Sequence, residues 1–162
     1  MGERAICRIE IFENRNTADL LDFRAMSTTS LEIQCRCGAV AVELTGEPYA
    51  HLYCHCDDCQ AVHCAAYVPV AMYGAGAVRI TRGTPASWQL RTTPRTTCRD
   101  CGTRLFASPP YAPIRGVTAY LLPAGIFEPS LHIYCKYALN PVRDGLPHYE
   151  TVPARFGGSD AV

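Results

Sequence analysis

The chain lacks both a net charge and a long apolar run. Its 15 basic residues balance 15 acidic ones, so electrostatics gives no reason to expect nucleic acid or an anionic membrane as a partner. No stretch approaches the roughly 20 consecutive apolar residues that a membrane-spanning helix needs. At 162 residues, the chain is long enough for one ordinary domain with a real core. The sequence thus predicts one globular domain that binds neither nucleic acid nor membranes.

The first two dozen residues also lack the uninterrupted apolar segment of a secretory signal, because charged residues are scattered through them. We therefore expect a cytoplasmic protein, in which reducing conditions favour metal binding by clustered cysteines over disulfides. A secreted disulfide scaffold is the alternative, which the length and the charged N-terminus disfavour. Residues 1–30 show no strong pattern, so we expect an N-terminal extension, and Met26 is an alternative start of the chain.

Cysteine is abundant, and seven of the ten cysteines fall in three clusters. Cys35 and Cys37 form a C-x-C-G unit, and Cys98 and Cys101 form a C-x-x-C-G unit. Each unit is typical of a zinc knuckle, and together they supply the four thiolates of a closed tetrahedral site. A shared zinc would close a long loop at a cost of only a few kcal/mol, whereas structural zinc contributes about 10–16 kcal/mol in finger peptides. We expect a structural zinc at these four residues.

The central cluster contains Cys54, Cys56 and Cys59 in the pattern C-x-C-x-x-C. Three thiolates on one tight turn suit the first three ligands of Zn²⁺ and leave one coordination position open, as in catalytic zinc sites. The alternative is that a fourth protein ligand closes the site, with the candidates Cys64, His63, His55 and His51. The spacing does not choose between the open and the closed site.

Alternating apolar and polar residues between Gly and Pro turns predict a mostly β fold with little helix. The expected strands cover residues 31–35, 39–44, 50–53, 78–82, 87–92, 103–108, 117–122 and 131–134. One or two helical turns are expected over residues 57–63, and the proline-rich residues 108–113 are expected to form a loop.

The ordered cysteine motifs resemble those of the glutathione-dependent formaldehyde-activating enzyme (GFA) family, which includes the centromere protein V domain. The matching motifs are C-x-C-G, C-H-C-x-x-C and C-x-x-C-G-T-x-L-F, and the segments at 131–134 and 146–153 are similar to the closing part of that family. The resemblance implies a zinc-containing β-tent fold of small antiparallel sheets. It also implies a GFA-like zinc domain at residues 31–153, between the N-terminal extension 1–30 and a flexible tail at 154–162.

The resemblance further implies two zinc ions and an enzymatic function. The structural zinc would be held by Cys35, Cys37, Cys98 and Cys101, and the catalytic zinc by Cys54, Cys56 and Cys59. The activity implied is that of a zinc-dependent carbon–sulfur lyase similar to S-hydroxymethylglutathione synthase. Its partners would be small molecules, an aldehyde such as formaldehyde and a thiol such as glutathione. The alternative is a non-catalytic, zinc-stabilised binding module or a thiol redox sensor.

Two positions depart from the family pattern. Cys64 stands where a glycine is common, and its sulfur could reach the second metal or form a disulfide with Cys59. Thr97 stands where an aromatic residue is common before the second knuckle. No cationic cluster marks a site for the carboxylates of glutathione, but the chain has arginines enough for one, namely Arg79, Arg82, Arg91, Arg95, Arg104 and Arg115.

Overall fold

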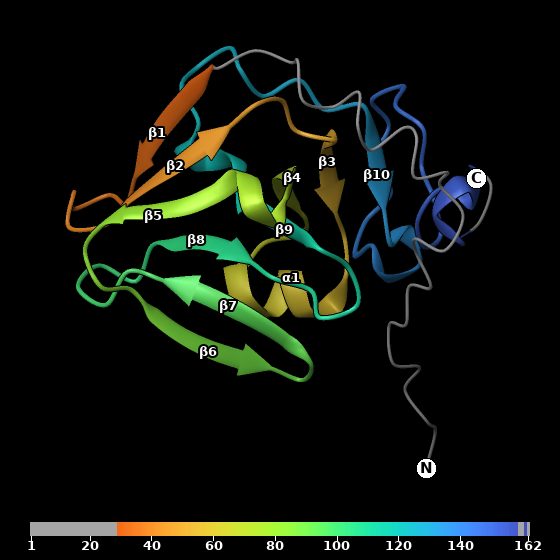
Figure 1. Cartoon of the computed structure of the whole chain (residues 1–162). Coiled ribbons are helices and arrows are strands. Elements are labelled where there is room, and N and C mark those ends of the chain that lie inside the picture. Colours follow the sequence, from red (N-terminus) through yellow and green to blue (C-terminus); the bar gives the residue numbers. More distant parts are fainter. Residues whose placement is uncertain (1–28, 159–160, 162) are drawn as a thin grey trace.

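Two β-sheets form the framework of the protein in a computed structural model that describes residues 29–158 and 161 (Figure 1). A three-stranded sheet has the order β1 (Ser30–Gln34), β2 (Ala41–Thr45), β5 (Val78–Arg82). A seven-stranded sheet has the order β10 (Leu131–Ile133), β3 (Ala50–Cys54), β4 (Val68–Gly74), β9 (Ile114–Thr118), β8 (Arg104–Ala107), β7 (Thr93–Thr97), β6 (Ala86–Leu90). Neighbouring strands are antiparallel except β10, which runs parallel to β3.

Helix is scarce in the described residues, which confirms the mostly β class. The α-helix α1 spans Asp57–His63 and follows β3 directly. The 3₁₀ turns are η2 (Ala75–Ala77), η3 (Ala119–Leu121), η4 (Cys135–Tyr137) and η5 (Ala154–Phe156). No helix in the described part of the chain is long and apolar enough to cross a membrane.

Helix α1 and strand β5 have the bounds that the sequence predicts, whereas β4 and β7 are not among the expected strands and other strand ends are shifted. Strand β7 was not expected, because the turn before it contains Arg91 at φ 52 instead of the glycine or asparagine that usually marks a tight hairpin. The strand expected at 117–122 is wrong beyond residue 118. Strand β9 begins earlier, at Ile114, and residues 119–121 form η3.

The predicted domain boundaries fall partly outside the described residues. Of the expected N-terminal extension, only residues 29 and 30 are described, and Ser30 already begins β1. The expected tail at 154–162 includes η5, and Ala161 forms an isolated bridge with Tyr149. The flexibility of this tail stays a prediction.

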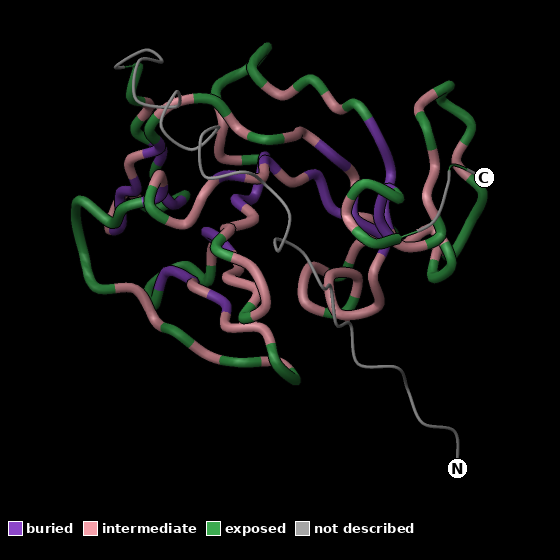
Figure 2. The backbone as a smooth tube through the Cα atoms, turned by 45° about the vertical axis from the view of Figure 1, so that its right-hand side comes forward, coloured by how far each residue is buried: buried purple, intermediate pink, exposed green. Residues whose placement is uncertain are grey.

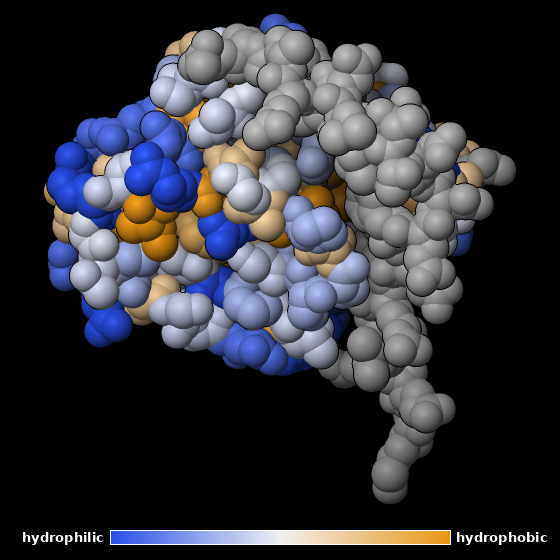
Figure 3. All heavy atoms as spheres, in the orientation of Figure 1, coloured by the Kyte–Doolittle hydropathy of each residue, from blue (hydrophilic) through white to orange (hydrophobic). Residues whose placement is uncertain are grey.

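The main core lies between the two sheets. Alternation along β4 sends Ala71 and Tyr73 into it, where they meet residues of the three-stranded sheet such as Val42 and Leu44. The buried stretches follow the middle of the strands in Figure 2, and the connecting loops are exposed. On the face in Figure 3, hydrophilic side chains gather at the left, over β1, β2 and β5.

A second, smaller core lies on the other face of the seven-stranded sheet. It contains Leu52, Cys54, Leu131, Ile133 and Val152, which come from β3, β10 and the C-terminal segment. The partly buried side chains of β4 that alternate with its core residues pack against this cluster, together with Cys56 and Cys59. This face therefore carries the central cysteine cluster.

Gly83 makes a close approach that we expect to be costly to disturb. Its φ is +80°, and a Cβ there would lie 2.2 Å from the carbonyl oxygen of Ala39, beside the first cysteine knuckle. Gly46 has a similar φ of +71° with nothing within 4 Å of a Cβ. Both Gly→Ala changes incur left-handed strain of about 1–2 kcal/mol. Gly83→Ala should lose at least about 1 kcal/mol more through overpacking, measured as free energy of unfolding in urea. Equal losses in the two variants would contradict this account.

Candidate metal centres and their cleft

The two cysteine knuckles meet in space. The tip of the β1–β2 hairpin supplies Cys35 and Cys37, and the β7–β8 loop supplies Cys98 and Cys101. All four sulfurs lie within 4.8 Å of one another. The Sγ atoms of Cys35 and Cys37 are 3.5 Å apart, and those of Cys37 and Cys98 are 3.7 Å apart. The four residues that the sequence grouped therefore form one cluster, as a tetrahedral site requires.

The acidity of these thiols favours a bound cation. Burial raises the pKa of Cys35, but the N–H of Val40, 3.2 Å from its Sγ, and the neighbouring thiols lower it overall. A hydrogen bond with the Thr103 hydroxyl lowers the pKa of Cys101 to about 6. A backbone hydrogen bond from Ala39 lowers the pKa of Cys37, but Cys101 and Cys35 outweigh it and raise it to about 12. Such a cluster ionises fully only around a cation, so the donor set fits Zn²⁺.

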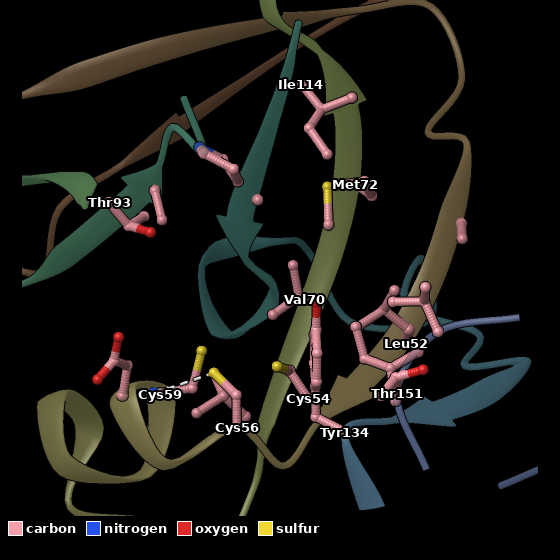
Figure 4. A pocket seen from close by; sticks show the side chains of 18 of the residues that line it. Leu52, Cys54, Cys56, Cys59, Val70, Met72, Thr93, Ile114, Tyr134 and Thr151 are labelled. Atoms are coloured by element: carbon pink, nitrogen blue, oxygen red, sulfur yellow. Dashed lines mark hydrogen bonds between the residues drawn. The ribbon is translucent and has the colours of Figure 1, made fainter. Parts of the chain in front are cut away.

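The central cluster forms where β3 ends and α1 begins. Cys54 is the last residue of β3, and Cys56 is the N-cap of α1, whose Sγ accepts a hydrogen bond from the N–H of Cys59 at 3.3 Å. The three sulfurs lie within 4.8 Å of one another and point toward a common centre (Figure 4). The sequence-predicted trio is therefore brought together by one strand end and one helical turn.

These three thiols cannot all lose their protons unaided. Hydrogen bonds from Cys54 and Cys56 lower the pKa of Cys59 to about 4. The same contacts and burial raise the pKa of Cys54 well above its usual value. For Cys56, the hydrogen bond with Cys54 lowers the pKa, but Cys59 and burial outweigh it and raise it to about 12. The first thiolate to form disfavours ionisation of the other two thiols. A divalent cation would remove this repulsion, so this donor set also fits one.

None of the four proposed closing ligands joins this group of sulfurs. Cys64 is exposed in a left-handed conformation at the end of α1, with its Sγ 3.9 Å from the carbonyl oxygen of Ala61. His51 accepts a hydrogen bond from the N–H of Glu128 at 3.1 Å. All cysteines in the described residues are free thiols, so the structure holds no disulfide between Cys64 and Cys59.

A cleft of about 1090 Å³ opens beside the central cysteines. All three line it, and the cleft face of the seven-stranded sheet forms its wall. The strand register places a row of residues across this wall, in the order Ala50, Met72, Gly116, Ala107, Arg95. The wall therefore changes from apolar at β3 and β4 to cationic at β7.

Arg95 is a cation that interacts directly with the central cysteines. It is 5% exposed, and the attraction between its guanidinium and Cys59 helps to lower the pKa of that thiol. Its Nε has no hydrogen-bond partner among the described residues. Arg104 lines the same cleft, whereas Arg91 is neutralised by Asp57 and Asp58 at 3.1 Å and 2.8 Å. Arg95 is one of the six arginines that the sequence analysis names as candidates for binding carboxylates. Only the pairing of β7 in the sheet shows that it lies beside the central cysteines.

A buried chain of polar side chains behind the cysteines was missed by sequence reasoning. His55 Nε2 lies 2.8 Å from His132 Nδ1, and His132 Nε2 lies 2.8 Å from Asp144 Oδ2. His148 lies 3.4 Å from the other oxygen of Asp144 and stacks on His132. His55 and His132 are 1% and 0% exposed, so each depends on these partners. The chain links the turn between Cys54 and Cys56 to the surface.

Comparison with known proteins settles the family. The model of the glutathione-dependent formaldehyde-activating enzyme family matches residues 30–137, well over half of the chain. The chain belongs to this family. The family is described as glutathione-dependent and formaldehyde-activating. The matched region includes both knuckles and the central cluster, as the resemblance of the motifs implies.

Among solved structures, this member of the formaldehyde-activating family is similar to a protein of Rhodobacter sphaeroides. The two share 25% sequence identity with a TM-score of 0.49, over 59% of this chain and 90% of the other. No curated protein matches the chain.

Zinc content should distinguish the two clusters from the other cysteines. We expect two zinc ions per chain by elemental analysis of protein purified without chelator, and one after Cys98→Ser or Cys56→Ser, because each removes one thiolate from a cluster. Cys135→Ser is the matched control, since Cys135 belongs to neither cluster and should leave two ions bound. Two ions retained in both cluster variants would contradict the assignment.

Asp144 should contribute stability that disappears in acid. Burial raises the pKa of Asp144, but hydrogen bonds from His132, the Leu146 N–H and His148 outweigh it and lower it to about 2. Because the folded pKa is depressed, this contribution is present above the unfolded value of 3.8 and is lost as the pH falls toward 2. Asp144→Asn should lose about 1 kcal/mol at pH 7, allowing for partial exposure.

The thermal midpoints of wild type and Asp144→Asn, followed by circular dichroism, should converge as the pH is lowered below 4. Glu150→Gln is the control, because Glu150 is exposed and should show a negligible loss at every pH. A loss for Asp144→Asn that does not depend on pH would argue against a stabilising role of the ionised Asp144 carboxylate.

Proposed function

We propose that this protein catalyses the reversible addition of glutathione or a similar thiol to an aldehyde, as a carbon–sulfur lyase of the S-hydroxymethylglutathione synthase type. The observation that carries the proposal is the cleft in which three convergent thiols lie beside Arg95, a buried cation that forms no salt bridge with a carboxylate among the described residues. Membership of a family that activates formaldehyde with glutathione supports the choice of substrates.

Cys54, Cys56 and Cys59 would hold the catalytic Zn²⁺, and Cys35, Cys37, Cys98 and Cys101 the structural one. A thiolate-ligated zinc with an open position would stabilise the incoming thiol as its thiolate at neutral pH. Joining the two knuckles would hold the β1–β2 hairpin to the β7–β8 loop, and this would fix strand β7 with Arg95 against the cleft.

Arg95 has a defined electrostatic role in this proposal. Three thiolates and one Zn²⁺ leave a net charge of −1 in a partly buried site, and such a charge is costly without a neighbouring cation. The guanidinium of Arg95 already attracts the Cys59 thiolate and would offset this excess. The site can then accept one more anionic sulfur.

Arg104 offers a second positive charge at the wall of the cleft. Its guanidinium lies 5.4 Å from the centre of the Trp88 ring, which holds it near the cleft without neutralising it. Glutathione carries two carboxylates, and arginine binds carboxylates through paired hydrogen bonds. Arg104 would therefore orient the thiol by one of its carboxylates.

The chemical step balances without an oxidant or reductant. The thiol sulfur forms a bond with the aldehyde carbon as the C=O π bond breaks, and the proton lost by the thiol ends on the resulting alkoxide oxygen. The product is a hydroxyalkyl thioether, and the reverse step releases the thiol and the aldehyde. The cleft contributes by holding the two reactants within reach of each other.

The direct test is the rate at which glutathione and formaldehyde form S-hydroxymethylglutathione, followed by NMR exchange with purified zinc-loaded protein. We expect acceleration over the spontaneous reaction, and its loss in Cys56→Ser. Circular dichroism and one retained zinc would show that this variant is folded. No acceleration by zinc-loaded wild type would favour a binding module instead.

Glutathione binding should depend on Arg104. Replacing one charge-assisted contact to a carboxylate should weaken affinity about 10-fold in Arg104→Gln, measured by isothermal titration calorimetry. Arg79→Gln is the matched control, because Arg79 pairs with Glu43 at 2.8 Å on β2 and does not line the cleft. An equal loss in both variants would show that net charge, and not this contact, governs binding.

A further inference from the structure

The cleft is larger and more apolar than the addition of formaldehyde requires. Its volume of about 1090 Å³ slightly exceeds the usual range of ligand pockets, which is about 300 to 1,000 Å³. Formaldehyde has a single carbon, and glutathione is a polar, charged tripeptide. An apolar wall would serve neither molecule, yet one half of the cleft is built from aliphatic side chains.

Strands β3, β4 and β9 build this apolar wall, which we define as Leu52, Val70, Met72 and Ile114. Leu52 pairs with Val70 across β3 and β4, and Ile114 of β9 pairs with Gly74, two positions beyond the pair of Met72 with Gly116. In Figure 4, Val70, Met72 and Ile114 follow one another away from the sulfurs of the central cluster. The apolar wall thus begins at the candidate reaction centre and leads away from it.

Within the part of the chain that the structure describes, the apolar wall is only partly covered. Val70, Met72 and Ile114 stay partly exposed, whereas Ala71 and Tyr73, which alternate with Val70 and Met72 on β4, are buried in the main core. Apolar area left open in a concave site is unfavourable in water and typical of a surface that a ligand covers. The exposure therefore indicates an apolar ligand group at this wall.

Gly116 leaves space in the cleft beside the apolar wall, because it has no side chain. It lies next to Met72 in the register, and a Cβ there would be 3.1 Å from Cγ1 of Val70 and 3.9 Å from Cε of Met72. Its backbone needs no glycine for conformational reasons, since its φ is not positive. A side chain at this position would fill space beside the apolar wall, so the absence of one leaves room for a ligand.

The opposite half of the cleft is cationic. Arg95 of β7 follows Gly116 and Ala107 in the row that crosses the sheet, and Arg104 lines the cleft from β8, the strand that also carries Ala107. A molecule with a charged half and an apolar half would match this division, if the atom joining the halves lay at the sulfurs. An adduct of glutathione with an apolar aldehyde has this form, because its carbon–sulfur bond joins the two halves.

We propose that the aldehyde handled by this protein carries an apolar chain or ring of several carbons, which lies against the apolar wall while the thiol half faces Arg95 and Arg104. This inference rests on the proposed function, because it specifies the substrate of the same site. The bond changes stay the same: the thiol sulfur adds to the carbonyl carbon, and the thiol proton ends on the oxygen. Formaldehyde would then be a poor substrate compared with a longer aldehyde.

The test compares stable adduct analogues on the full-length, zinc-loaded chain by isothermal titration calorimetry. S-methylglutathione and S-hexylglutathione differ by five methylenes, each worth about fourfold in affinity when fully buried. Half-burial of these groups predicts that S-hexylglutathione binds about 30-fold more tightly. Met72→Gln keeps the size of the side chain but makes the apolar wall polar, and it should reduce this preference to a few-fold. Ile126→Gln is the control, because Ile126 is exposed and does not line the cleft.

The outcomes separate this inference from the proposed function. If glutathione binds but the hexyl analogue is no tighter than the methyl one, the apolar aldehyde is ruled out and the proposed function stands. If neither glutathione nor either analogue binds, the proposed function fails as well. A hexyl preference that survives Met72→Gln would overturn the assignment to the apolar wall. A preference that falls in Met72→Gln and persists in Ile126→Gln is the expected result.

Discussion

The mutual repulsion of clustered thiolates is the constraint on which the rest of this structure depends. Seven cysteines converge in two groups whose sulfurs lie within 4.8 Å of one another. Within each group, ionisation of one thiol raises the pKa of another, so both groups favour a cation. Positive groups near the sulfurs stabilise the thiolates. The backbone N–H of Val40 donates to Cys35, and the buried guanidinium of Arg95 lies beside Cys59.

The seven-stranded sheet positions the site, because one of its faces packs in the main core and the other lines the cleft. One face packs against the three-stranded sheet in the main core. The other face is left as the wall of a cleft, with the central cysteines at one end and a change from apolar to cationic across the strands. The alternation of single strands such as β4 produces both faces at once, so the stability of the core and the shape of the cleft are coupled.

The parallel pairing of β10 with β3 supports the site from behind. It brings His132 beside Tyr53 and within 2.8 Å of His55, which stands between two of the central cysteines. The chain of hydrogen bonds then continues to Asp144. Buried polar groups of this kind fix the orientation of their neighbours, because an alternative arrangement would leave a donor or acceptor unpaired. The turn that carries the central cysteines is therefore held both by the pairing of β3 with β10 and by the hydrogen bonds of His55.

The sequence by itself determined the features that depend on local sequence motifs. The spacing of Cys54, Cys56 and Cys59 places three sulfurs on one turn, the residues of α1 follow directly, and the glycine-ended knuckles identify both partners of the first cluster. The central turn and α1 were predicted because neighbouring residues decide them, whereas the meeting of the two knuckles, 61 positions apart, was inferred from their matching motifs. The mostly β class followed in the same way from alternation and turns.

The tertiary structure alone decided what depends on long-range register. Strand β7 begins after a turn without glycine, so its local sequence gave no sign of the hairpin that carries Arg95 to the cleft. The meeting of His55 with His132, 77 positions apart, depends on a parallel pairing that no local pattern encodes. The division of the cleft into an apolar and a cationic half likewise arises only when β3, β4, β9, β8 and β7 lie side by side. Side chains from separate strands share one face through hydrogen-bonded register, which is a property of the assembled sheet and not of any one segment.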